Sequence, residues 1–149
     1  MNKNQLMLIT GGVFNFAIGL THIVIPFLGP KAYLFFGAGQ DMASMAATSP
    51  LIPGAVTIIF ALFFIIFGLY AFSGAEHLRR LPLLRFALAG ISGVFVLRGL
   101  FVPLDIYNYL TKQEPIRFAL FSLVALVVGL LYLWPTAQLW KILKEEVNQ

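Results

Sequence analysis

Three ionisable residues stand out because each lies inside an apolar segment or at its end. Arg98 and Asp105 are seven residues apart, about two helical turns, so both side chains fall on one face of a helix. His22 lies in an earlier apolar segment. A guanidinium binds carboxylate or phosphate oxygens, and an imidazole exchanges a proton near neutral pH. These three residues therefore carry the candidate chemistry of the chain.

The composition around these residues is that of an integral membrane protein. Of the 149 residues, 60% are hydrophobic and 11% are charged, and the mean hydropathy is +0.89. A soluble domain carries about 25% charged residues, so a soluble globule and a disordered tail are excluded. The chain contains no cysteine, which also excludes a disulfide scaffold and thiol–disulfide chemistry.

Four apolar runs are long enough to cross a hydrocarbon core of about 30 Å as helices. The predicted spans cover residues 6–28, 51–72, 84–104 and 116–134, and an interfacial outer loop covers residues 29–50. The predicted fold class is all-α, an integral membrane four-helix bundle in which residues 1–149 form one transmembrane domain. Pro26, Pro103 and Pro135 lie near span ends, where proline ends or bends a helix.

The distribution of basic residues predicts the orientation of these spans. Four spans return the chain to its starting side, so the amino end, the second loop and the carboxyl end share one side. That side holds six basic residues and the other side three: Lys3, Arg79, Arg80, Arg85, Lys141 and Lys144 against Lys31, Lys112 and Arg117. Both termini are therefore predicted to be cytoplasmic. The basic second loop is expected to serve orientation and contact with anionic lipid.

This orientation brings the three ionisable residues to the outer third of one bundle, given a rise of about 1.5 Å per residue. Asn15 lies nearer mid-membrane and is expected to form an interhelical hydrogen bond. The outer loop is expected to contain an amphipathic helix around Met42, Met45 and Ala46, and to form a lid over the site. The candidate ligand-binding residues are Arg98, His22, Tyr33, Asp105, Gln40, Asp41 and Asn15.

A structural role is the alternative for each of these residues. Arg98 could extend to the lipid headgroups with Asp105 beside it. His22 could donate a hydrogen bond to a backbone carbonyl or contact Thr21, and the outer loop could be a plain interfacial segment.

Small residues and short recurring motifs suggest how the spans pack. Glycine and alanine on the first and third spans predict close packing of these two helices: Gly11, Gly12, Ala17 and Gly19, with Ala87, Ala89, Gly90, Gly93 and Gly99. Residues 12–14 recur as 93–95, and residues 60–63 recur as 118–121. The two hairpins could therefore form a weak pseudo-twofold repeat, with chance recurrence of common residues as the alternative.

Four short stretches, residues 37–39, 68–75, 81–85 and 97–100, resemble a group of small bacterial four-span membrane proteins. More distantly, the architecture resembles the DoxX-like proteins. The resemblance spans residues 10–104 and implies a bacterial inner-membrane protein, but it implies no activity.

Three functions are compatible with these residues. The first is a non-enzymatic membrane protein whose outer-leaflet pocket binds an amphipathic or anionic ligand, a lipid or a quinone-like molecule, through Arg98 with His22 and Tyr33. The second is an accessory subunit of a larger membrane complex, or a homodimer. The third is a lipid-modifying or isomerising enzyme with His22 as acid or base, assisted by Asp105 or Asp41.

The predicted partners are membrane lipid and such a ligand, without nucleic acid or cofactor. No metal centre is expected, because the only two histidines, His22 and His77, fall on opposite sides of the membrane.

Overall fold

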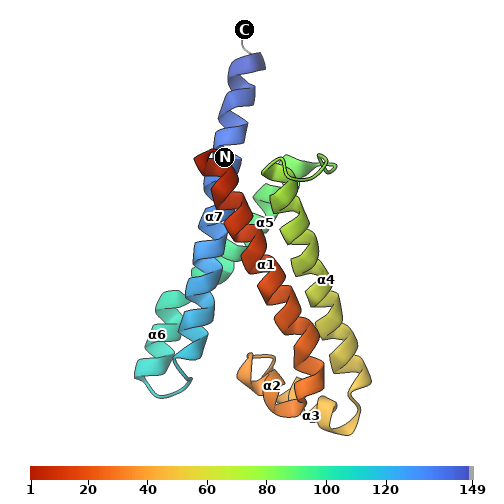
Figure 1. Cartoon of the computed structure of the whole chain (residues 1–149). Coiled ribbons are helices and arrows are strands. Elements are labelled where there is room, and N and C mark those ends of the chain that lie inside the picture. Colours follow the sequence, from red (N-terminus) through yellow and green to blue (C-terminus); the bar gives the residue numbers. More distant parts are fainter. Residues whose placement is uncertain (148–149) are drawn as a thin grey trace. The chain divides into compact units, whose positions relative to one another are not determined.

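The structure is a computed structural model that describes the backbone of residues 1–147 and the side chains of residues 1–138 and Trp140. All regular elements in this part of the chain are helices (Figure 1). They are α1 (Lys3–Leu28), α2 (Pro30–Phe35), α3 (Gly39–Thr48), α4 (Leu51–Gly74), α5 (Leu84–Gly99), α6 (Val102–Leu110) and α7 (Arg117–Val147). The predicted all-α class is confirmed.

Four helical segments are long and apolar enough to cross a membrane: Lys3–Leu28, Leu51–Gly74, Leu84–Leu110 and Arg117–Gln138. Much of their apolar surface is exposed, for example at Phe60, Phe63, Leu120 and Leu130. A helix that is apolar on every side and still exposed is typical of a membrane span. The four predicted spans are therefore confirmed, and each begins or ends within a few residues of its predicted bounds.

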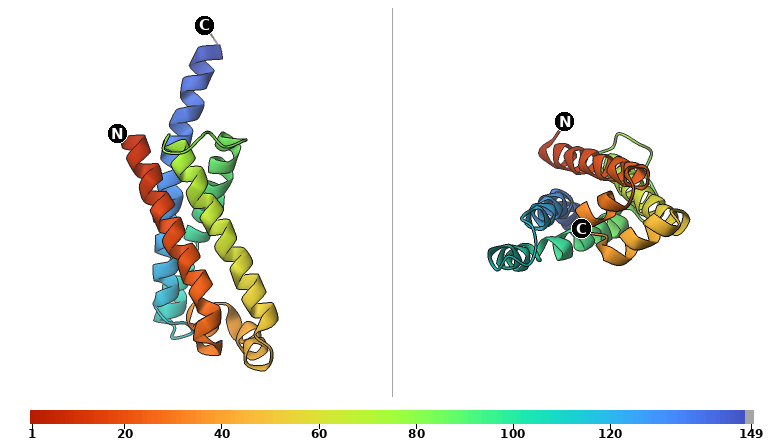
Figure 2. Two further views of the ribbon diagram at one scale, coloured as in Figure 1. Left: turned by 45° about the vertical axis from the view of Figure 1, so that its right-hand side comes forward. Right: turned by 90° about the horizontal axis from the view of Figure 1, so that it is seen from below.

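The chain divides into two compact units, one formed by Met1–Gly12 with Leu69–Gln149 and the other by Val13–Gly68. In the first unit α5 packs along α7, and α6 lies against the start of α7 (Figures 1 and 2). At one end of this unit Gln5 Nε2 donates a hydrogen bond to Glu76 Oε2 at 3.0 Å. At the same end the rings of Phe86 and Trp140 meet edge to face, with centroids 5.5 Å apart. The amino end, the α4–α5 loop and α7 thus lie together, as segments on one side of a membrane should.

The third span is bent, and Pro103 explains the bend. Proline has no N–H to donate to the carbonyl of Gly99, and its ring crowds that carbonyl. The helix is interrupted there, and the Phe101 N–H donates to the Arg98 carbonyl at 3.3 Å in a tighter, three-residue turn. Helical structure then resumes and continues to Leu110, beyond the predicted end at residue 104. Pro135, by contrast, lies inside α7 and does not end it.

The glycines pack closely, but against other helices than predicted. Their nearest neighbours lie on the second and fourth spans: Tyr132 for Gly11, Phe72 for Gly12, Ala61 for Gly19 and Leu126 for Gly99. Within the first unit, the predicted packing of the first span against the third through Gly11, Gly12 and Gly99 is wrong, because these glycines make room for side chains and backbone of α4 and α7. Gly93, which begins the recurrence of residues 12–14, has no neighbour within 4 Å of an added Cβ. The recurring motif therefore does not mark equivalent packing positions.

In the second unit the predicted outer loop is mostly helical. An apolar cluster joins the end of α1 to α2 and α3: Ile25, Ala32, Tyr33 and Ala43, with Met42 and Ala46 packed against it. The predicted amphipathic helix is confirmed as α3, which turns Met42 and Ala46 inward and leaves Met45 exposed. This cluster fixes the α2–α3 segment to the end of α1.

Candidate functional site

Arg98 and Asp105 form an ion pair across the bend between α5 and α6. Arg98 Nη1 lies 3.5 Å from Asp105 Oδ2. The hydroxyl of Ser122, on α7, joins the two: Arg98 Nη1 donates to Ser122 Oγ, which in turn donates to Asp105 Oδ2. The Arg98 guanidinium also lies over the ring of Phe101, with Cζ 5.9 Å from the centroid. We call Arg98, Asp105 and Ser122 the arginine cluster.

The burial of the arginine cluster decreases from Ser122 to Arg98. Ser122 is fully buried, and the side chain of Asp105 is 11% exposed, whereas that of Arg98 is 45% exposed. A carboxylate this deeply buried is costly unless a cation and a hydrogen-bond donor compensate it. Arg98 and Ser122 supply both, and the position of Asp105 in the first turn of α6 adds a favourable interaction with the helix dipole.

Arg98 has more donors than the cluster uses. A guanidinium carries five N–H donors in a planar fork. The ion pair and the hydrogen bond both involve Nη1, and among the described residues no partner contacts Nε or Nη2. Arg98 is therefore anchored on its inner edge and presents its outer edge at the protein surface.

His22 lies in the second unit and bonds within its own helix. Its Nδ1 is 2.8 Å from the carbonyl oxygen of Ile18. A carbonyl only accepts, so Nδ1 carries the hydrogen in this contact and Nε2 is left as an acceptor. The imidazole lies beside the ring of Phe64, with centroids 4.8 Å apart. These contacts match the structural alternative considered for His22. His22 and Arg98 lie in different units, so the predicted proximity of the two residues stays a prediction.

The remaining predicted ligand-binding residues also lie in the second unit. Tyr33 is 2% exposed and belongs to the apolar cluster of α1, α2 and α3, whereas Gln40 and Asp41 are exposed at the start of α3. Asn15 is fully buried in α1. The burial of Tyr33 indicates a packing role within its unit, and the role of these four residues as a lid and pocket stays a prediction.

No family model, curated protein or solved structure matches the chain. The DoxX-like resemblance thus stays a prediction.

Sequence reasoning found two of the three members of the arginine cluster and missed Ser122. The seven-residue spacing of Arg98 and Asp105 predicts their shared face, and the structure brings them together. Ser122 carries the only aliphatic hydroxyl between residues 118 and 135 of an otherwise apolar span. Such a hydroxyl is typical of an interhelical contact in a membrane, and this signal could have identified it.

Proposed function

We propose that this chain is a non-enzymatic membrane protein that binds an amphipathic ligand through the outer edge of Arg98. The ligand has acceptor oxygens at its polar end, either the phosphate of a lipid or the carbonyl of a quinone-like molecule. The observation that carries this proposal is the half-exposed guanidinium, held at Nη1 by Asp105 and Ser122, with Nε and Nη2 directed to no described residue.

The ion pair favours binding over the other functions. Asp105 cancels most of the charge of Arg98, so the arginine can lie in an apolar span without a large desolvation cost. Within the ion pair the guanidinium keeps its charge and can still donate two parallel hydrogen bonds. This arrangement suits the oxygens of a polar headgroup better than it suits a free ion as ligand. Asp105 is engaged by two partners, which makes it a poor candidate for the proton-transfer role in a lipid-modifying enzyme.

Native mass spectrometry of the delipidated protein tests this proposal. Phosphatidylglycerol and a short-chain benzoquinone serve as probes, added separately to the wild type and to variants. The critical variant is the double substitution Arg98→Met/Asp105→Leu, since replacing both members of the ion pair leaves no uncompensated charge in the span and should cost little stability. We expect the wild type to retain more molecules of one of the two probes than the double variant does.

Arg79→Gln is the matched control, because Arg79 is an exposed arginine in the α4–α5 loop outside the arginine cluster. It should bind as the wild type does. Equal retention of both probes by the wild type and the double variant would refute the proposal, and the probe that is retained distinguishes a lipid from a quinone-like ligand.

A further inference from the structure

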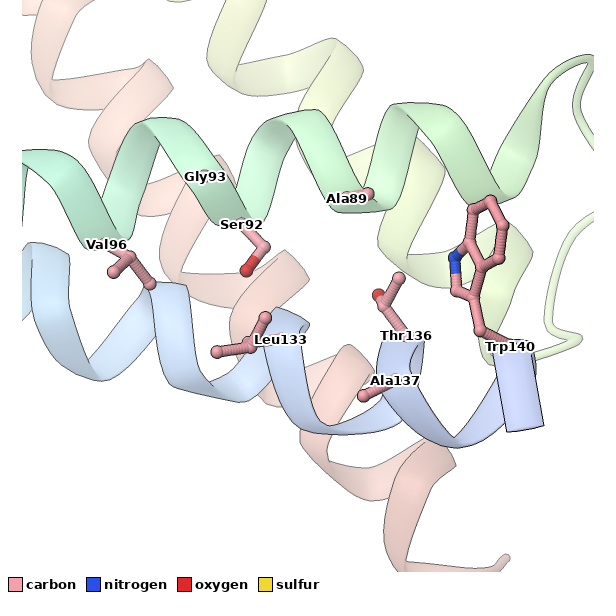
Figure 3. Close-up of a pocket in the computed structure, with 8 residues that line it drawn as sticks. All are labelled: Ala89, Ser92, Gly93, Val96, Leu133, Thr136, Ala137 and Trp140. Carbon is pink, nitrogen blue, oxygen red and sulfur yellow. The ribbon is translucent and has the colours of Figure 1, made fainter.

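A groove runs between α5 and α7 in the first unit (Figure 3). None of the residues that line it belongs to the arginine cluster. Its volume is about 290 Å³. Small residues line much of it, namely Ala89 and Gly93 of α5 and Ala137 of α7, and Trp140 reaches from α7 toward α5 at one end. An added Cβ at Gly93 would meet no atom within 4 Å, so the groove is open beside this residue.

The two hydroxyl groups in the groove wall are already bonded to the backbone. Ser92 Oγ donates to the carbonyl of Gly129 at 3.2 Å, and Thr136 Oγ1 donates to the carbonyl of Tyr132 at 2.7 Å. Both residues are buried. The groove therefore offers a ligand little hydrogen bonding, and inside a bilayer it suits an apolar chain.

A second cavity, of about 500 Å³, adjoins the groove at Trp140 and is basic. It is lined by Arg80 and Arg85 together with Phe86 and the same Trp140. No described acidic residue forms an ion pair with either arginine. The nearby Glu76 carboxylate accepts its hydrogen bond from Gln5 instead. Among the residues whose side chains the structure describes, the two arginines thus have no ionic partner beside the mouth of the groove.

The α4–α5 loop is fixed so that Arg80 stays at this cavity. The buried hydroxyl of Ser73 donates to the carbonyl of Arg79 at 3.1 Å and accepts from the N–H of Leu81 at 2.9 Å, which holds the backbone on both sides of Arg80. The Tyr70 hydroxyl donates to the Pro82 carbonyl at 3.2 Å. The loop is therefore anchored to α4, and the position of Arg80 is set before any ligand arrives.

We propose that this groove and cavity form a binding site for one anionic phospholipid. One acyl chain occupies the groove along Ala89, Gly93 and Ala137, and the phosphate is bound by Arg80 and Arg85, with Trp140 at the level where chain and headgroup meet. Arginine and tryptophan are the residues that favour this interfacial level. This site goes beyond the proposed function at Arg98 and shares no residue with the arginine cluster.

Charge favours a lipid over a second copy of this chain in the groove. Small residues on a span also let a neighbouring helix approach. However, a second copy with the same membrane orientation would carry its own Arg80 and Arg85 at the same depth, and like charges would face each other. An anionic headgroup neutralises the same two arginines.

Quenching of Trp140 fluorescence by brominated lipid tests the site. Trp134→Phe leaves Trp140 as the only tryptophan, since the chain has two. The protein is placed in phosphatidylcholine bilayers that contain increasing fractions of phosphatidylglycerol brominated in its acyl chains. We expect phosphatidylglycerol to quench at lower fractions than equally brominated phosphatidylcholine. Arg80→Gln and Arg85→Gln should each reduce this preference about fivefold, the loss of one arginine contact at an anionic surface.

Two matched pairs of variants distinguish the site from general surface charge and from dimerisation. Arg79→Gln neutralises an arginine in the same loop outside the cavity and should keep the preference. Gly93→Leu fills the groove and should reduce quenching by both lipids, whereas Gly90→Leu, also in open space, should not.

Three results would overturn the proposal: equal quenching by the two lipids, equal losses in the Arg79 and Arg85 variants, or unchanged quenching in Gly93→Leu. Loss of a dimer by Gly93→Leu in native mass spectrometry, with quenching retained, would assign the groove to a second copy. The Arg98→Met/Asp105→Leu variant should keep the lipid preference, so failure of the Arg98 proposal and failure of this one give different results.

Discussion

A double-mutant cycle on Arg98 and Asp105 tests whether the ion pair works as a unit. The variants are Arg98→Met, Asp105→Leu and the double substitution. Removal of one partner from a fully buried pair costs about 3–5 kcal/mol, because the other charge is left uncompensated. The Arg98 side chain is 45% exposed and that of Asp105 only 11%, so the cost should be smaller than this and unequal for the two partners.

We expect Arg98→Met to lower the free energy of unfolding by about 2 kcal/mol, since it strands the buried carboxylate. Asp105→Leu should cost about 1 kcal/mol, because the half-exposed guanidinium can extend toward the lipid headgroups. The double variant should lie within about 1 kcal/mol of the wild type, which corresponds to a coupling of at least about 2 kcal/mol. Reversible unfolding by sodium dodecyl sulfate in mixed micelles, followed by far-ultraviolet circular dichroism, measures all four free energies. Single effects that add to within about 0.5 kcal/mol would refute the coupling and the role given to the pair.

Three further predictions concern packing. Gly99→Val should destabilise the α5–α7 contact by about 2 kcal/mol, because its Cβ would lie 2.6 Å from the Leu126 Cα. Gly90→Val, in open space, should not destabilise the protein in the same unfolding assay. Equal effects of the two substitutions would contradict the close approach of α7 to Gly99. Ser122→Ala should cost about 1 kcal/mol in that assay, since one interhelical hydroxyl is lost, and no change would show that Ser122 does not support the pair. Tyr33→Ala should remove about 3 kcal/mol from the apolar cluster of α1, α2 and α3 and make residues 29–50 sensitive to limited proteolysis, while unchanged cleavage would contradict its buried position.

The sequence is a good guide to the spans because hydropathy and length alone decide which segments cross a membrane. It also predicts that Pro103 disturbs the third span, since the missing N–H is a local property. The continuation of that span as α6 is harder to predict, because residues 105–110 mix Asp105, Asn108 and two tyrosines with apolar residues. These residues belong to α6, which contacts α7, and no local pattern predicts that contact.

Helix partners are the least predictable part of the fold. A glycine in a span indicates that a neighbouring helix packs closely there, but it does not indicate which helix. Gly11 and Gly99 were expected to bring the first and third spans together, yet both accommodate residues of α7. The lone hydroxyl of Ser122 indicates a contact between helices, but its partners depend on which side chains of α5 and α6 lie opposite it.

A density map of the protein in a lipid nanodisc would reveal directly whether a ligand binds the outer edge of Arg98. We expect density for an amphipathic molecule whose polar oxygen lies within hydrogen-bond distance of Arg98 Nε or Nη2, while Nη1 stays on Asp105 and Ser122. Ligand binding at Arg98 would be refuted by a map in which Nε and Nη2 bond to another part of this chain. It would equally be refuted if the guanidinium had left Asp105 for the headgroup region with no ligand beside it.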